Sequence, residues 1–448
     1  MTECSTDALD FERLGSRQVV GNFDGGRLTS DAGALILREV DRRIGLIDAL
    51  NSCIPDPRDP LLTQHEQVTM LTQRIFGIAL GYEDLNDHQT LRGDPAMQVA
   101  AGVQPEEDDP MASPSTLCRL ENRIDRRTLA KLAEVFVEQF IAARASQGAP
   151  KELILDFDAT DDPLHGHQEG RFFHGYYDNY CYLPLYVFCG DELLVPYLRP
   201  SNIDGAKHSR AILKLLVRRF RQEWPQVKII LRADSGFCRW RLMRWCDRHG
   251  VDYILGLARN KVLERLGASW IEESERQFEQ SQEKQRVFGE FTYAATPWDR
   301  ERRVIIKAER LVEGPNTRFV VTSLEGEPQP LYDDVYCQRG EAENRIKEQQ
   351  LGLFAGRTSC GKMYGNQFRL FLSSAAYVLM HALRRIALEG TELERSQVQT
   401  IRLKLLKVAA RVVVSTRRVR FYMASSYPYQ ELFRKLLDRL GGPQMAPI

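Results

Sequence analysis

The order of short apolar runs between Glu152 and Leu257 constrains the fold of this chain more than any other feature. Three runs rich in aliphatic and aromatic residues come first, and each has the length of a strand. Helix-like and strand-like segments then alternate, so the expected order is βββαβαβ. The expected strands are 153–157, 182–188, 192–198, 227–231 and 253–257, and the expected helices are 206–221 and 239–249.

This order predicts an α/β fold with a ribonuclease-H-like mixed sheet, by analogy of fold, because a doubly wound sheet would alternate from its first strand. The preceding segment has helical apolar spacing, and the segment after the last strand is charged with strand-like runs. A long helix near 334–350 follows, and the chain ends in a basic, helical tail. The expected divisions are 1–148 (helical N-terminal domain), 149–257 with 330–390 (mixed-sheet domain), 258–329 (β-rich insertion) and 391–448 (basic helical tail).

Composition excludes several classes of protein but does not select a function. The 61 basic and 61 acidic residues of this 448-residue chain balance, so any affinity for nucleic acid must come from local basic segments. Such segments lie at 218–221, 239–248 and 402–420. Nine cysteines without a CxxC pair argue against a disulfide framework or a zinc ribbon. We therefore expect reduced thiols in a cytoplasm. The acidic, polar segment MTECSTDALDFERLG and the lack of a long apolar run predict no secretory signal and no membrane partner.

Acidic side chains follow two of the expected strands. In LILDFDATDD, the period of two places Asp156 and Asp158 on one face with Ile154. Asp234 comes directly after the strand VKIIL, within LRADSGF. Ligands of open sheets bind at the carboxyl ends of strands, which favours a functional role. Taken singly, each acid also fits a strand that leaves the core or an ordinary strand-to-helix turn.

A third acid lies on the long helix. Five polar side chains share about a quarter of its circumference at 100° per residue: Tyr336, Arg339, Glu343, Lys347 and Gln350. An adjacent apolar stripe (Val335, Ala342 and Ile346) would pack this helix on the sheet. The alternative is a surface ion pair between Glu343 and Lys347, which any helix can carry.

Taken together, these segments resemble a known family. The resembling residues read DFDATDDPLHGHQEGRFFHGYYDNYCYLPLYVFCG, LRPSNIDG, RADSGF and YCQRGEAENRIKEQQLGLFAGRTS, in this order between Leu153 and Ser359. They resemble DDE-type insertion-sequence transposases of the IS-four superfamily, most closely the family numbered thirteen-eighty. The superfamily's Asp-x-Thr triplet falls on Asp158-Ala159-Thr160 and favours Asp158 over Asp156.

The superfamily's Tyr-x2-Arg-x3-Glu-x6-Lys signature is matched at Tyr336, Arg339 and Glu343. Gln350 stands where the signature has lysine, and Lys347, one helical turn earlier, could replace it. The resemblance also implies a β-rich insertion between the last two acids, which the segment 258–329 fits.

The resemblance implies an enzyme that cleaves DNA and transfers strands, with Asp158, Asp234 and Glu343 as catalytic, metal-binding carboxylates. Three carboxylates suit Mg²⁺, with Mn²⁺ as a substitute, because hard cations prefer oxygen ligands and two ions stabilise an in-line displacement. Arg339, Lys347 and Tyr336 would contact the DNA. The expected partners are double-stranded DNA, both terminal inverted repeats and target, and a second copy in a synaptic dimer, in a nucleoid-associated location.

Base recognition requires another region, because a catalytic centre must accept any sequence. The helical domain 1–148 is the expected DNA-binding domain, and the segment 115–127 offers Arg119 and Arg123 at helical spacing. An ordinary amphipathic surface helix would look the same.

Two other functions remain open. His165 and His167, with His174, could bind the metal of a hydrolase, although glycines place the first two in a loop. A catalytically inactive, transposase-derived DNA-binding regulator would keep the fold without the chemistry.

Overall fold

A computed structural model describes residues 8–145 and 148–441 of the chain. Two compact units divide it. Unit 1 combines the N-terminal segment up to Asn51, residues 56–120 and the C-terminal segment from Ala382, and unit 2 combines 52–55 with 121–381. Across the described ranges, no helix is both long enough and apolar enough to cross a membrane.

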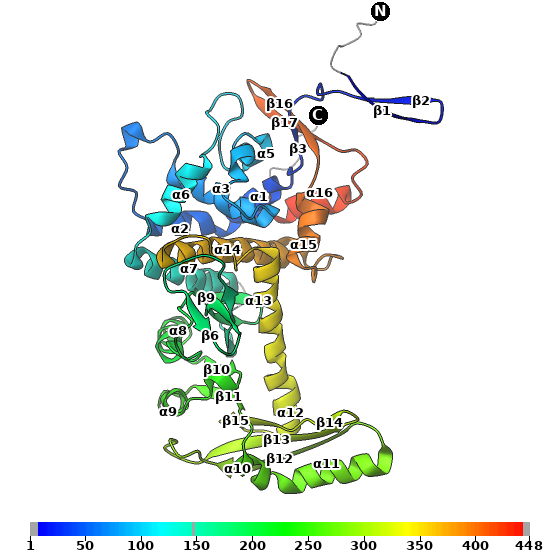
Figure 1. Cartoon of the computed structure of the whole chain (residues 1–448). Helices are drawn as coiled ribbons and strands as arrows, with labels where there is room; N and C mark the ends of the chain where they lie inside the picture. Colours follow the sequence, from blue (N-terminus) through cyan, green and yellow to red (C-terminus); the bar gives the residue numbers. More distant parts are fainter. Residues whose placement is uncertain (1–7, 146–147, 442–448) are drawn as a thin grey trace, which may run out of the picture. The chain divides into compact units, whose positions relative to one another are not determined.

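A nine-stranded mixed sheet forms the centre of unit 2 (Figure 1). β4 pairs with an antiparallel neighbour on one side and a parallel neighbour on the other, so the sheet is mixed as expected. The chain order confirms the expected strand–helix alternation and supports the ribonuclease-H-like class. In chain order, the elements that correspond to the expected strands and helices are β4 (Glu152–Ala159), β8 (Leu185–Cys189), β9 (Glu192–Tyr197), α8 (Ser209–Glu223), β10 (Lys228–Ala233), α9 (Trp240–Arg248) and β11 (Asp252–Leu257).

Alternation along β4 decides what each face of this sheet contacts. Leu153, Leu155 and Phe157 are buried in a core with α8, α9 and α7 (Arg126–Ala145). Ile154 faces the opposite side, where it packs in a second cluster with Tyr332. Asp156 and Asp158 share the side of Ile154, because strand side chains alternate.

The chain between β4 and β8 forms a small sheet that the sequence did not predict. It consists of β5 (Asp162–Pro163), β6 (Phe172–His174) and β7 (Asn179–Tyr182), with β7 in the middle. The expected strand 182–188 is therefore two strands, because β7 ends at Tyr182 and β8 begins at Leu185.

The strands of the expected β-rich insertion 258–329 extend the central sheet. β15 pairs antiparallel with β11. The side chains of β15 from Phe319 to Thr322 are all buried, as expected for a strand inside a sheet that is covered on both faces. Two helices that were not expected precede these strands. The elements are α10 (Lys261–Leu266), α11 (Ala268–Ser281), β12 (Gln285–Tyr293), β13 (Arg302–Leu311), β14 (Gly314–Pro315) and β15 (Arg318–Thr322).

The expected helix near 334–350 is part of a longer helical segment. It runs through α12 (Pro328–Pro330), a π-helical turn η3 (Leu331–Tyr336), a 3₁₀ turn η4 (Cys337–Arg339) and α13 (Gly340–Gly352). The apolar helix α14 (Met363–Leu383) follows. Wide π turns are rare and recur at functional sites, and this one directly precedes the signature arginine.

Unit 1 contains helices, as expected, but also strands at both ends of the chain. Its elements are β1 (Leu9–Leu14), β2 (Arg17–Gly21), β3 (Leu28–Thr29), α1 (Ala34–Ile44), α2 (Leu46–Cys53), η1 (Pro60–Leu62), α3 (Gln67–Leu80), α4 (His88–Leu91), α5 (Pro95–Ala100), η5 (Arg384–Leu388), α15 (Val398–Ile401), η6 (Arg402–Leu406), β16 (Ala410–Ser415), β17 (Arg418–Met423) and α16 (Gln430–Arg439).

The C-terminal segment 391–448 was expected to be helical, and this is corrected for residues 410–423, which form strands. β16 and β17 form an antiparallel hairpin, and β16 also pairs with β3. β-branched residues in ARVVVS favour a strand over a helix. The tail also bonds to N-terminal residues: Lys407 pairs with Asp31 at 2.6 Å, and Arg402 donates to the carbonyl of Ala79 at 2.8 Å.

Gly289 provides the first test of this packing. A Cβ at position 289 of β12 would lie 2.1 Å from the indole ring of Trp270 on α11. We therefore expect Gly289→Ala to lower the free energy of unfolding by about 1–3 kcal/mol in urea titrations, because a rigid ring must move.

Gly340→Ala is the matched control. Its Cβ would meet nothing within 4 Å, and residue 340 has helical backbone angles. It should leave stability unchanged or raise it by up to about 1 kcal/mol. Equal effects of the two substitutions would contradict this view of the α11–β12 contact.

Candidate active site

Asp156 is engaged in a buried ion pair between neighbouring parallel strands. Arg232 of β10 lies directly opposite it, and the guanidinium donates to both carboxylate oxygens at 2.5 and 2.7 Å. The side chain of Asp156 is only 2% exposed, and that of Arg232 is 8% exposed. Arg232 also donates to the carbonyl oxygen of Val335 at 2.6 Å. This clamp joins β4 and β10 to the helical segment before α13.

Asp158 lies two residues further along β4, near its carboxyl end, and is half-buried. Burial raises the pKa of its carboxyl to about 7. The positive charge of Arg339 opposes this rise, whereas the negative charges of Asp234 and Glu343 add to it. Asp234, Glu343 and Arg339 therefore all lie within electrostatic range of Asp158.

Asp234 directly follows β10, as Asp158 nearly ends the neighbouring strand. Its side chain accepts a hydrogen bond from the backbone N–H of Gly236 at 2.9 Å and caps the short helix η2 (Ser235–Phe237). Glu343 lies in the first turn of α13, and its carboxylate pairs with Arg339 at 2.5 Å. Two strand ends and one helix thus supply the three carboxylates.

Tyr336 lies against the turn that carries Asp234. A Cβ on Gly256 of β11 would come within 2.6 Å of the Tyr336 hydroxyl and 2.7 Å of the backbone nitrogen of Ser235. The glycine therefore makes room for the ring. The charges of Arg339 and Asp234 both act on the Tyr336 hydroxyl, so this side chain belongs to the same site.

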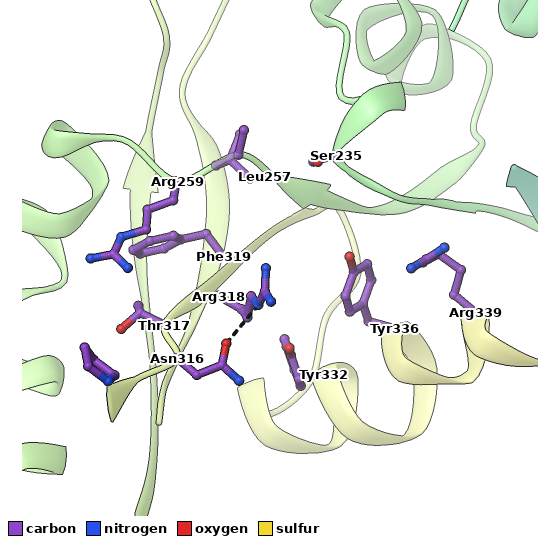
Figure 2. A pocket seen from close by; sticks show the side chains of 12 residues that line it. Ser235, Leu257, Arg259, Asn316, Thr317, Arg318, Phe319, Tyr332, Tyr336 and Arg339 are labelled. Carbon is purple, nitrogen blue, oxygen red and sulfur yellow. Dashed lines mark hydrogen bonds between the residues drawn. The ribbon is translucent and has the colours of Figure 1, made fainter. Parts of the chain in front are cut away.

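A pocket of about 510 Å³ adjoins these residues (Figure 2). Tyr336 and Arg339 line it from the helical segment, and Ser235 lines it from the turn after Asp234. The opposite wall comes from the segment around β14 and β15. The other residues that line the pocket are Leu257, Ala258, Arg259, Pro315, Asn316, Thr317, Arg318, Phe319 and Tyr332. Three arginines and two tyrosines thus surround a cavity beside the acids, and sequence reasoning had assigned no role to Arg259 or Arg318.

The model of the transposase DDE domain group 1 family matches residues 11–444 of the chain. The chain belongs to this family. It is therefore a DDE transposase, and such enzymes generally use divalent metal ions. The insertion-sequence superfamily expected from the sequence is a finer assignment than this match.

Among curated proteins no relative matches this transposase. Among solved structures, the chain is similar to a piggyBac transposase in a synaptic complex with hairpin DNA. The structural match covers 94% of this chain and 87% of the piggyBac chain. The sequence identity is 12% and the TM-score is 0.40.

The donor set of the three acids fits a hard divalent cation. All three are carboxylates, which are the oxygen ligands that hard cations prefer. One oxygen of Asp158 accepts a hydrogen bond from the backbone N–H of Ala159 at 2.9 Å. In the described ranges 8–145 and 148–441, no three His, Cys, Asp or Glu side chains already stand in a metal-binding group. Arg339 instead provides the positive charge next to Glu343.

The two remaining polar positions on α13 differ in environment. Gln350 donates from its amide to the carbonyl oxygen of Asp161 at 3.2 Å, so it contacts the loop that follows β4. Lys347 is exposed one helical turn earlier. Position 350 is therefore engaged with the protein, whereas the basic side chain of Lys347 is exposed to solvent.

Arg119 and Arg123 do not lie on one continuous helix, which corrects the expectation for 115–127. α6 (Pro114–Asn122) ends before Arg123, and α7 begins at Arg126. The side chain of Asp125 accepts from the N–H of Thr128 at 2.8 Å and so caps α7. Arg119 is exposed and Arg123 is half-buried, and their contact with DNA stays a prediction.

The three histidines do not form a metal site in the described ranges. His165 and His167 lie in a loop, and His174 lies in β6 with its ring 5.0 Å from that of Tyr177. The structure therefore gives no support to the histidine-ligated hydrolase.

The buried pair of Asp156 and Arg232 predicts a large loss of stability without one partner. Asp156→Ala should lower the free energy of unfolding by about 3–5 kcal/mol, because Arg232 would remain buried without its counter-ion. Urea titration followed by circular dichroism measures this change.

The same two strands carry a matched control at their other ends. Lys228 and Glu152 are paired at 3.0 Å but are 49% and 40% exposed, so Glu152→Ala should cost about 0–1 kcal/mol. Replacing both buried partners (Asp156→Leu with Arg232→Met) should restore part of the loss. Asp156→Ala as stable as Glu152→Ala would rule out the clamp.

Proposed function

We propose that this chain is the transposase of a bacterial insertion sequence of the IS-four superfamily, closest to the thirteen-eighty family. It would cut DNA at the terminal inverted repeats and join the freed 3′-OH to target DNA. The observation that carries the proposal is the convergence of Asp158, Asp234 and Glu343 from two strand ends and α13, with Arg339 beside them.

The three carboxylates would hold Mg²⁺, or Mn²⁺ in its place. When bound, these cations supply a more acidic water as nucleophile and neutralise charge on the phosphate. Asp158 and Asp234 extend from adjacent parallel strands, so the sheet fixes their separation. Glu343 completes the set from a helix that the Asp156–Arg232 clamp holds against the sheet.

Phosphate binding would fall to the basic groups next to the acids. Arg339 already lies among the carboxylates, and a guanidinium can bind two phosphate oxygens at once. Arg259 and Arg318 line the adjoining pocket and extend the basic surface away from the acids. We infer that the strand being cut passes through this pocket, with Tyr336 against the nucleotide nearest the turn of Asp234. Lys347, exposed on the same helix, would contact a neighbouring phosphate.

End recognition would come from unit 1, because the active site reads phosphates and not bases. Arg119 on α6 and the basic hairpin β16–β17 are the candidate contacts. Since each active site acts on one DNA end, we propose a homodimer in the synaptic complex, in the cytoplasm and associated with the nucleoid. We disfavour the inactive regulator because all three acids are present in the sequence and the charges of Asp234 and Glu343 both act on Asp158.

Isosteric substitutions test the catalytic assignment. Asp158→Asn, Asp234→Asn and Glu343→Gln should each reduce nicking of duplex DNA carrying the element's end by at least about 100-fold. Asparagine keeps the acceptor oxygen that Asp158 offers to Ala159 and that Asp234 offers to Gly236. The variants should therefore fold and bind the duplex as the parent does.

Glu341→Ala is the matched control on α13, because Glu341 is 57% exposed and lies two residues from Glu343. It should cut at the parental rate. Parental nicking by any of the three isosteric variants would remove that acid from the site, and nicking in excess EDTA would exclude the metal mechanism.

Metal binding has a readout that does not depend on activity. Mn²⁺ at about 100 times its dissociation constant should raise the free energy of unfolding by about 2.7 kcal/mol, because it binds only the folded site. Asp158→Asn should lose this stabilisation. Without metal, the variant should be at least as stable as the parent, because an amide replaces a partly buried acid that two neighbouring carboxylates repel. An equal rise in both proteins would place the cation elsewhere.

A further inference from the structure

The hairpin formed by β6 and β7 exposes several aromatic rings. Tyr176 in its loop is 85% exposed, Phe173 on β6 is 52% exposed, and Tyr180 on β7 is 47% exposed. Rings of this size normally bury most of their area, and clustered exposed apolar groups mark a binding surface. We call the segment Arg171–Tyr180 the aromatic hairpin.

The rings of the aromatic hairpin are ordered. Phe173 and Tyr180 are cross-strand partners, with ring centroids 5.6 Å apart and planes at 71°. The guanidinium of Arg171 lies over the Tyr180 ring, 4.0 Å from its centroid. One side of the hairpin therefore combines two rings with a cation, and both groups suit the flat faces and phosphates of nucleotides.

Two contacts tie the aromatic hairpin to the strand end that carries Asp158. The Tyr177 hydroxyl donates to the carbonyl oxygen of Ala159 at 3.3 Å. The Asn179 amide donates to the carboxylate of Asp161 at 3.1 Å. Tyr176 packs edge-on against Tyr177, with centroids 4.9 Å apart. The exposed ring of Tyr176 thus lies beside Tyr177, whose hydroxyl reaches the strand end next to Asp158.

We propose that the aromatic hairpin binds unpaired DNA bases beside the cleavage site, with Tyr176 and Phe173 as stacking residues and Arg171 near the backbone. The inference rests on the proposed function, because cutting one strand of a duplex lets neighbouring bases unpair. Stacking on aromatic rings accepts every base, so this surface needs no sequence preference. Pairing of bases within a duplex would exclude them from it.

Binding of a single strand tests the proposal in the full chain. The Asp158→Asn background prevents cleavage, and the probes are a fluorescein-labelled oligothymidylate of about 16 nucleotides and a duplex of equal length. Tyr176→Ala should weaken binding of the single strand about 5- to 100-fold, as expected for the loss of one stacked base, and should change duplex affinity less than about twofold. Tyr176→Phe keeps the ring and should bind as the parent does.

Tyr364→Ala is the control for removal of an exposed ring, because Tyr364 on α14 is 48% exposed. It should leave both affinities unchanged. The alternative is that a second copy of the chain covers the aromatic hairpin. Analytical ultracentrifugation of each variant tests this by measuring whether the chain is a monomer or a dimer.

Three results would overturn the inference: no parental binding of oligothymidylate, an equal loss for single strand and duplex, or loss of dimer on Tyr176→Ala with unchanged affinity for the single strand. The proposed function is separable, since it fails only if the enzyme with all three acids does not cut duplex DNA.

Discussion

The ion pair of Asp156 and Arg232 is the interaction on which the geometry of the site depends. Each partner precedes a site acid by two residues, so each lies on the same side of its strand as that acid. Fixing Asp156 against Arg232 therefore fixes Asp158 relative to Asp234. The third bond of Arg232, to the carbonyl of Val335, places the helical segment that leads to Glu343. One buried cation thus positions the three elements that carry the acids.

The same pair explains why two neighbouring acids in DFDAT have different roles. Asp156 is buried and both its oxygens accept from one guanidinium, so its charge is neutralised by a dedicated partner. Asp158 lies nearer the strand end, where burial is partial. Its charge is balanced by Arg339 and not by a dedicated partner. A substitution of Asp156 would therefore change activity through the fold, and this makes it unsuitable as a neutral control.

The sequence predicted the central strands and helices because their apolar patterns are long and regular. It predicted the shared face of Asp156 and Asp158 for the same reason, but only the family resemblance separated their roles, because the pairing of Asp156 depends on the register between β4 and β10. The small sheet β5–β7 escaped prediction, since strands of two to four residues have too little pattern. The break between α6 and α7 had a local signal in Asp125, a helix cap that the apolar spacing from Leu117 concealed.

Pairing between strands that are far apart in the chain could not be predicted from the sequence. Nothing local indicates that the C-terminal hairpin pairs with β3, or that β15 joins the sheet through β11. Position 350 illustrates the same limit. The signature has lysine there, whereas Gln350 holds α13 to the carbonyl of Asp161 just beyond β4. The amide therefore serves the contact between helix and strand end, and the positive charges on this face of the helical segment are Arg339 and the exposed Lys347.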